Sequence, residues 1–287
     1  MDLPILYMQS PFMTSKKTIK KWLAELGYNV VKVPKSRGNI LKDRLSKNLE
    51  MGYFYESEAF EAMQVISSNT MLPYEPLVTL FEQVVYCEKN NIEGAFVECG
   101  TWKGGATGMM ALANLKYGVS RRHLHLFDAF QEICQPDEEH DDKKIVNEVM
   151  KLVKKRKFDE ELKPLTGVYD QFGGPGTLIE NKKLLEHAIG YPPDHLHYHV
   201  GWFQDTIPAD ADSISKIAIL RLDGDWYQST KVCLDHLYDK VVKNGIVIID
   251  DYGYNTGCKK AVDEFLAEKK TFPILTYINN TCRYFIK

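Results

Sequence analysis

The chain has 287 residues, of which 44% are hydrophobic and 26% are charged. This length and composition suit a globular protein with one large α/β domain and a substantial core, or such a domain with an added subdomain. The formal net charge of -3 produces no field that would gather nucleic acid, so we exclude a polyanionic partner.

The first segment, residues 1–57, is basic and rich in turns, with one short helical pattern that Thr14 or Ser15 can cap and Gly27 can end. It predicts an N-terminal appendage that serves as a lid or in contacts of a homo-oligomer. Its apolar start lacks the basic region and the cleavage site of a signal peptide, and no apolar run reaches the roughly 18 residues of a membrane span. Six cysteines without C-x-x-C spacing favour reduced thiols in the core. We therefore expect a cytoplasmic protein.

The remaining chain, 58–287, alternates between short apolar runs and amphipathic ones. Helical patterns near 57–67 and 74–90 come first and are expected to cover one face of a sheet. Strands are predicted over 95–99, 123–127, 196–200, 216–222 and 246–250, and helices near 104–116, 227–242 and 257–269. Two β-rich runs, 273–278 and 282–286, form a terminal hairpin. The pattern predicts an α/β fold with a doubly wound, mainly parallel, seven-stranded sheet and an antiparallel edge.

An insertion between 131 and 175 interrupts this alternation. It contains an acidic run (137–142), a basic helix with Lys151, Lys154 and Arg156, and a glycine-rich stretch (173–176). Insertions of this length in a compact fold are often lids or substrate-recognition elements. A solvated helix and loop is the alternative.

A strand, a glycine-bearing turn and a helix follow one another from Ala95 onward. Glycines let the backbone pass close to a ligand at the carboxyl edge of a sheet. Glu98, at the strand end, would repel a pyrophosphate but can accept a hydrogen bond from the amino group of a methionine moiety. This favours S-adenosylmethionine (SAM) over a dinucleotide. Asp128 ends the next strand, where a ribose diol is usually held; a purely structural turn is the alternative.

Two apolar strands each end in a pair of carboxylates: Asp223 and Asp225 follow the first, and Asp250 and Asp251 follow the second. If the strands are parallel neighbours, all four converge at the edge that carries the glycine turn. Unpaired, their mutual repulsion would raise their pKa values and reduce stability. A hard divalent cation such as Mg²⁺, which takes oxygen ligands, resolves that conflict. The alternative is that Asp223 and Asp250 only cap the helices that follow.

Three histidines, His195, His197 and His199, alternate along a predicted strand and therefore share one face. We interpret them as partly buried residues of the sheet rather than as metal ligands. Trp202 follows that strand and is suited to packing on an adenine ring.

Four stretches, 97–105, 201–206, 220–230 and 247–252, resemble the macrocin O-methyltransferase (TylF/MycF/NovP-like) family of SAM- and Mg²⁺-dependent sugar O-methyltransferases. The aspartate block within 220–230 is the most specific of them, and Asn69-Thr70-Met71 and 257–263 also look like the family. The resemblance runs from about residue 60 to the C-terminus. It departs after the second strand, where the family commonly has D-S-F-E-G-L-P and this chain has Asp128-Ala129-Phe130-Gln131-Glu132-Ile133-Cys134.

The resemblance implies a class I SAM methyltransferase fold, Rossmann-like, with SAM and Mg²⁺ or another divalent cation as cofactors. It implies that Asp223, Asp250 and Asp251 bind the metal and that Asp225 is the general base on the substrate hydroxyl. The residues expected around the cofactor are Glu98, Gly100, Thr101, Gly104, Gly105, Asp128, Gly201, Trp202, Thr70 and Met71.

We therefore expect methylation of a hydroxyl group on a small-molecule acceptor, a sugar or a glycosylated natural product, with no nucleic-acid or membrane partner. A metal-dependent catechol or phenol O-methyltransferase is one alternative, because a single cation can hold two adjacent oxygens. A non-catalytic SAM-binding or scaffold protein, or a lyase-like enzyme on the same fold, is another. The intact set of four aspartates argues against loss of catalysis.

Overall fold

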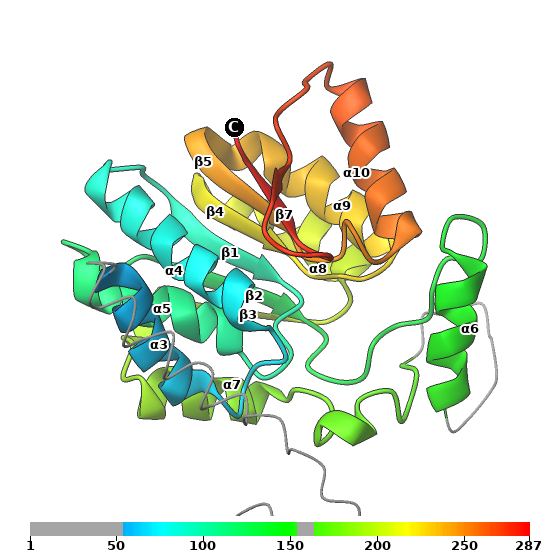
Figure 1. The fold of residues 1–287 in the computed structure, drawn as a ribbon, viewed down its shortest axis with the longest axis horizontal. Coiled ribbons are helices and arrows are strands. Elements are labelled where there is room, and N and C mark those ends of the chain that lie inside the picture. The colour runs from blue at the N-terminus through cyan, green and yellow to red at the C-terminus, as the bar shows by residue number, and fades with distance from the viewer. Residues whose placement is uncertain (1–53, 154–163) are drawn as a thin grey trace, which may run out of the picture. The chain divides into compact units, whose positions relative to one another are not determined.

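A computed structural model of the chain describes residues 54–153 and 164–287. Their core is a sheet with the strand order β3-β2-β1-β4-β5-β7-β6 (Figure 1). The strands are β1 (Ala95–Cys99), β2 (Leu124–Asp128), β3 (Leu196–Val200), β4 (Ile217–Leu222), β5 (Val241–Ile249), β6 (Thr276–Tyr277) and β7 (Arg283–Ile286). The first five are parallel, whereas β7 is antiparallel to β5 and to β6. The predicted mainly parallel seven-stranded sheet with an antiparallel C-terminal edge is confirmed.

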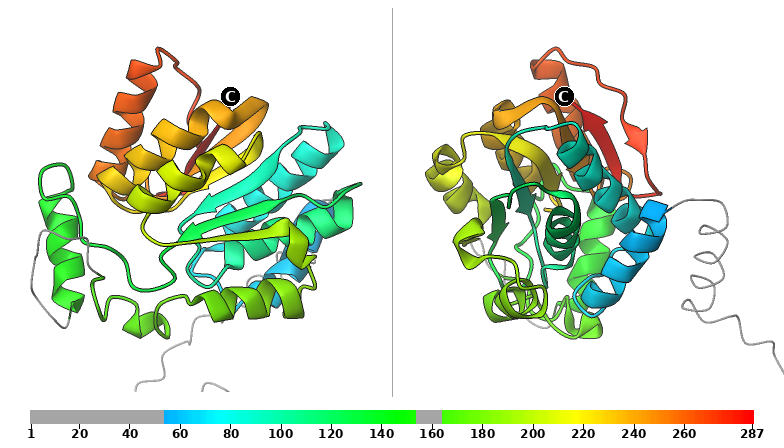
Figure 2. Two further views of the ribbon diagram at one scale, coloured as in Figure 1. Left: turned by 180° about the vertical axis from the view of Figure 1, so that it is seen from behind. Right: turned by 90° about the vertical axis from the view of Figure 1, so that its left-hand side faces the viewer.

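Helices cover both faces of the sheet (Figures 1 and 2). One face is covered by α3 (Phe54–Ile66), α4 (Tyr74–Lys89), α5 (Gly105–Tyr117) and the π-helical turn Lys183–Ala188 that continues α7 (Leu178–Lys182), and the other by α8 (Phe203–Asp210), α9 (Tyr227–Leu237) and α10 (Thr256–Glu268). Successive strand residues point to opposite faces. In β1, Phe96 joins the first hydrophobic cluster, while Val97 and Cys99 join the second. The sheet is therefore buried on both sides, as a doubly wound fold requires.

The strand order reverses direction beside β1, which pairs with β2 on one side and with β4 on the other. In open α/β sheets, the crevice at the carboxyl ends of the strands next to such a reversal is where ligands bind. The glycine turn follows β1, and the two aspartate pairs follow β4 and β5. All three predicted motifs therefore lie at this one crevice.

The predicted helix over 227–242 is wrong at its C-terminal end. The α-helix ends at Leu237, a single 3-10 turn follows, and β5 begins at Val241 instead of 246. The misleading signal is that Leu234, Leu237, Tyr238 and Val241 repeat at helical spacing and are all buried. Val241 pairs with Ile217 of β4, so a tertiary contact decides what the local pattern could not.

Other differences concern short elements. The sequence did not predict α7, the π-helical turn that continues α7, or α8. The strand β6 is two residues long, whereas a strand over 273–278 was expected. The insertion contains α6 (Lys143–Leu152), none of whose residues is buried. The helix predicted near Thr14 lies outside the described residues. The same is true of Lys154 and Arg156 in the predicted basic helix. The division at 57 into appendage and domain, and a role of the appendage in a homo-oligomer, stay predictions; α3 begins three residues before that division.

All six cysteines are buried and free, as expected. None of the helices in the described ranges has the length and apolar character that crossing a membrane would require.

Histidines form a ladder across β2 and β3. His123 Nδ1 lies 2.8 Å from His197 Nε2, and His125 Nδ1 lies 3.0 Å from His199 Nε2. His199 Nδ1 in turn lies 2.7 Å from Asp210 Oδ2. The rings of His125 and His197 stack at 4.4 Å. In each of these imidazole–imidazole hydrogen bonds the accepting nitrogen carries no proton, in agreement with histidines that belong to the sheet rather than to a metal site.

Acid is expected to destabilise the fold through His125, which is 7% exposed. Burial, and then the neighbouring histidines, lower its pKa from 6.5 to about 3. Below pH 6.5 the His125 imidazole is therefore protonated in the unfolded chain, whereas in the folded chain it stays neutral down to about pH 3. The free energy of unfolding decreases as the pH falls through this window. Between pH 6.5 and pH 5 this group alone removes about 2 kcal/mol.

Urea unfolding at pH 7.5 and pH 5 measures this effect. The variant His125→Asn keeps a donor but does not titrate, so its free energy of unfolding should change less between the two pH values than that of the wild type. Equal pH dependence in the two proteins would show that the ladder is not the acid-sensitive element.

Candidate active site

The turn after β1 is the first element of the site, and its backbone requires glycine. Gly100 and Gly104 have φ angles of +92° and +83°, in the left-handed region that favours glycine. A Cβ on Gly100 would lie 1.9 Å from the backbone oxygen of Asp223. The turn therefore runs directly against the end of β4 and brings the glycine motif and the first aspartate pair together.

Asp128, at the end of β2, holds this turn. Its Oδ2 accepts hydrogen bonds from the backbone N–H groups of Thr101, at 2.6 Å, and Trp102, at 3.1 Å, while its Oδ1 accepts from that of Phe130 at 2.6 Å. Burial raises the pKa of Asp128, and these donors oppose the rise. The sequence indicated a residue that binds a ribose; the structure adds a second task, the support of the glycine turn.

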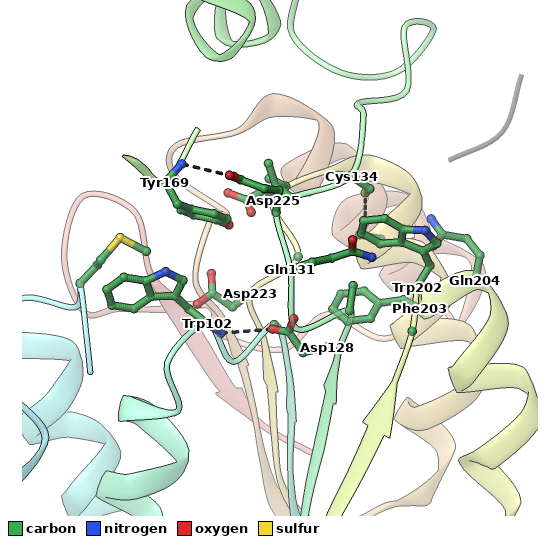
Figure 3. A pocket seen from close by; sticks show the side chains of 18 residues that line it. Trp102, Asp128, Gln131, Cys134, Tyr169, Trp202, Phe203, Gln204, Asp223 and Asp225 are labelled. Atoms are coloured by element: carbon green, nitrogen blue, oxygen red, sulfur yellow. Dashed lines mark hydrogen bonds between the residues drawn. The ribbon is translucent and has the colours of Figure 1, made fainter. Parts of the chain in front are cut away.

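A first cavity lies at the carboxyl ends of the strands (Figure 3). Of the residues predicted around the cofactor, it is lined by Met71, Gly100, Asp128, Gly201 and Trp202. Its wall also contains Asp223 and Asp225. The sequence did not single out Trp102, Gln131, Cys134, Tyr169, Phe203 or Gln204, which also line it. Phe203 and Gln204 belong to the family-like stretch 201–206 but were not assigned to the cofactor, whereas nothing in the sequence pointed to Tyr169.

A second cavity adjoins the first and contains the aspartates. Thr70, Glu98, Thr101 and Gly105 line it, together with Met71, which borders both cavities. All four aspartates of the two pairs are in its wall, and Phe172 and Tyr254 add aromatic surface. Of the ten positions predicted around the cofactor, only Gly104 lines neither cavity. Whether each of these positions binds the cofactor stays a prediction.

Arg221 is the main feature of the site that the sequence reasoning missed. It is 2% exposed, and its Nη1 donates to Glu98 Oε1 at 2.7 Å and to Asp223 Oδ2 at 2.8 Å, while Nη2 donates to Asp250 Oδ1 at 2.8 Å. Glu98 and Arg221 are register partners on β1 and β4, so their side chains share a face of the sheet. Matching these positions from the two strand ends would have revealed the pair.

Glu98 therefore has protein partners where a ligand was expected. Its Oε1 accepts from Arg221, and its Oε2 accepts a short hydrogen bond from the Thr107 hydroxyl. Burial raises its pKa to about 7, against the opposing charge of Arg221. Each carboxylate oxygen has a second lone pair, so an additional donor from a ligand remains compatible with this geometry.

The aspartate pairs converge as the sequence predicted, because β4 and β5 are parallel neighbours. One oxygen each of Asp223, Asp250 and Asp251 lies within 4.8 Å of the others. Burial, and then the charge of Asp223, raise the pKa of Asp250 to about 6, and burial followed by Asp225 raises that of Asp251 well above its usual value. Carboxylate oxygens at this spacing fit the ligand set of a hard divalent cation.

The net charge of the cluster supports this fit. Arg221 supplies one positive charge to five acidic side chains, namely Glu98 and the four aspartates. Its three hydrogen bonds leave Asp223 Oδ1 and Asp250 Oδ2 free of the guanidinium. The internal arginine therefore reduces the repulsion without using all the oxygens that a cation needs.

Helix capping does not account for these aspartates. The N-cap of α9 is Trp226, without a side-chain cap, and the N-cap of α10 is Asn255, whose side chain accepts from Gly257 N–H. Asp223 and Asp250 are thus free of the structural task that was the alternative.

Asp225 differs from the three clustered aspartates. Its φ of +59° is unusual for a residue with a side chain and aims it toward both cavities, which it lines. Within the described part of the chain its carboxylate accepts no hydrogen bond, although its backbone N–H donates to Asp251 Oδ2 at 3.3 Å. Burial, and then Asp223, raise its pKa to about 8. Such a group is a proton acceptor at neutral pH once a nearby positive charge restores its ionised form.

Comparison with known proteins gives consistent results. Residues 62–166 and 187–287 match the family described as Macrocin-O-methyltransferase (TylF). The chain is 33% identical over 210 residues to a demethyldecarbamoylnovobiocin O-methyltransferase of Streptomyces niveus, covering 70% of this chain and 69% of that one. It is 30% identical over 200 residues to a mycinamicin III 3''-O-methyltransferase of Micromonospora griseorubida, covering 69% and 70%.

Among solved structures, the O-methyltransferase NovP matches with a TM-score of 0.62 and 27% identity, over 76% of this chain and 82% of that one. The calicheamicin methyltransferase CalS11 matches with a TM-score of 0.50 and 17% identity, over 90% and 94%, which is a likeness of fold.

Proposed function

Because the chain belongs to the macrocin O-methyltransferase (TylF) family and is thus a SAM-dependent O-methyltransferase, we propose that it methylates a hydroxyl of a sugar or glycosylated natural product with the help of a divalent cation. The observation that carries the proposal is the convergence of Asp223, Asp250 and Asp251 beside Asp225. The two relatives, a demethyldecarbamoylnovobiocin O-methyltransferase and a mycinamicin III 3''-O-methyltransferase, support the class of acceptor.

Each cavity has its own role in this proposal. The first cavity, with Trp202 and Asp128, would hold the adenosine part of the cofactor: the indole offers a stacking surface, and Asp128 Oδ1 keeps acceptor capacity for a ribose hydroxyl. The second cavity would hold the methionine part of the cofactor near Glu98 and Thr70, and the acceptor hydroxyl beside the aspartates. Asp225 lines both and stands where the two ligands would meet.

When bound, SAM would supply an activated methyl group on its sulfonium, and a divalent cation on Asp223, Asp250 and Asp251 would supply the positive charge that makes a hydroxyl more acidic. Asp225 would then accept the hydroxyl proton at its carboxylate, within hydrogen-bond reach. Arg221 fixes Asp223 and Asp250 from the buried side and so keeps the cluster in one arrangement. Positioning of the two ligands by this rigid edge would supply much of the acceleration.

The activity is tested by incubating the protein with SAM and a panel of glycosylated natural products. Mass spectrometry would then detect a gain of one methyl group, and calorimetry would measure SAM binding. Simple catechols belong in the same panel, because methylation of catechols alone would favour the phenolic alternative over the sugar.

Removal of the metal is expected to lower turnover at least tenfold, because Asp225 would then act on a hydroxyl without an adjacent positive charge. The measurement is the initial rate after treatment with EDTA, followed by titration with MgCl₂, which should restore the rate. A rate that stays unchanged in EDTA, for a protein shown to be free of metal by elemental analysis, would contradict the metal part of the proposal.

A further inference from the structure

Residues 167–176, at the C-terminal end of the insertion and just before α7, form a segment that we call the strap. It is fixed at its start by Glu132, whose Oε1 accepts from the Gly167 N–H at 2.9 Å and whose Oε2 accepts from the Tyr169 N–H at 3.4 Å. Nearby, Val168 packs in a small hydrophobic cluster with Val153 and other residues of the insertion. The strap is therefore an anchored element.

The other end of the strap is fastened to the glycine turn. Trp102 Nε1 donates to the backbone oxygen of Gly174 at 3.2 Å, and Lys103 Nζ donates to that of Gly173 at 3.1 Å. A Cβ on Gly176 would lie 1.9 Å from the backbone oxygen of Trp102, so the two backbones touch. The turn that borders the first cavity and the strap that contributes Tyr169 to its wall are therefore joined.

The strap carries two aromatic side chains that serve different cavities. Tyr169 lines the first cavity and points, in Figure 3, toward the part of it where Asp223 and Asp225 lie, whereas Phe172 lines the second cavity. The Tyr169 hydroxyl has no hydrogen-bond partner within the described ranges, so no internal hydrogen bond explains its orientation. The family match omits residues 167–186, so it does not extend to the strap.

We propose that Tyr169 is a positioning residue whose ring recognises the positively charged sulfonium of SAM; this rests on the proposed function. Methyl transfer to a hydroxyl beside Asp225 requires the sulfonium at the end of the first cavity nearest the aspartates, and Tyr169 lines that cavity with Asp225. The face of an aromatic ring attracts a cation, more strongly where water is excluded. Unlike a further carboxylate, a ring attracts the sulfonium without competing for the metal.

The test is calorimetry with two cofactor forms, SAM, which is a cation at sulfur, and S-adenosylhomocysteine (SAH), which is neutral there. Tyr169→Ala is expected to weaken SAM about tenfold and SAH by less than about threefold, so the preference for SAM falls. Tyr169→Phe keeps the ring and should keep both affinities within about twofold. Phe172→Ala, which removes a ring of similar size from the same strap, is the matched control and should keep the SAM to SAH ratio of the wild type.

If Tyr169→Ala leaves the ratio of SAM to SAH affinity unchanged, whether both affinities fall equally or neither falls, Tyr169 does not recognise the sulfonium charge and the proposal is overturned. A loss in Tyr169→Phe as large as in Tyr169→Ala would overturn the role of the ring. Thermal melting checks that each variant is folded, and Tyr169→Leu replaces the alanine variant if that one is not. Failure of the wild type to bind SAM at all would instead contradict the proposed function.

Discussion

Replacement of Asp225 by asparagine is expected to reduce the rate of methyl transfer by roughly 10²-fold or more. Asparagine has the same shape but cannot take up the hydroxyl proton. It also tolerates the left-handed backbone that Asp225 adopts at a φ of +59°, so the substitution adds little strain. SAM affinity is expected to stay near that of the wild type, because the residues proposed to hold the adenosine part are unchanged.

Initial rates with saturating SAM and calorimetry with SAM alone measure the two effects separately. Asp212→Asn is a suitable control, because Asp212 is fully exposed on the 3-10 turn after α8 and pairs only loosely with Lys240 at 3.3 Å. An Asp225→Asn enzyme that retains more than about a tenth of the wild-type rate would exclude Asp225 as the general base.

The fold was largely predictable because its central strands, such as β1 and β4, are buried on both faces and its helices on one. The two kinds of segment therefore differ in length and period, and their alternation indicates the doubly wound sheet. The end of α9 was not predictable by the same means, since Val241 continues the helical spacing of buried residues while pairing in β5. Local periodicity cannot distinguish a residue that extends a helix from one that starts the next strand.

The convergence of the aspartates was predictable because it follows from topology alone: residues at the carboxyl ends of adjacent parallel strands meet. The partners inside the site were not, because they depend on which side chains share a face. Arg221 precedes Asp223 by two residues, so in an extended chain the two side chains point to the same face of the sheet. The insertion and its glycine-rich stretch were predicted, but the position of Tyr169 was not, since the hydrogen bonds that fix the strap join residues 35 to 72 positions apart without a recognisable motif.

Removal of Arg221 is expected to have the largest effect on stability. Its guanidinium is buried with Glu98, which is 1% exposed, and with Asp250. The variant Arg221→Met leaves these buried carboxylates without their cation, and breaking a buried ion pair in this way costs about 3–5 kcal/mol. Urea unfolding measured at pH 7 should report this decrease in the free energy of unfolding.

Three further variants separate charge from geometry. Lys216→Met breaks an exposed pair with Glu93 and should cost at most about 1 kcal/mol. Arg221→Lys keeps the charge but lacks the planar fork that reaches three carboxylates at once, so it should fall between wild type and methionine. Adding Glu98→Gln to Arg221→Met removes one of the stranded charges and should recover part of the loss. If Arg221→Met is no less stable than Lys216→Met, the buried arginine does not hold the aspartates together, and their arrangement must depend on the strand backbones alone.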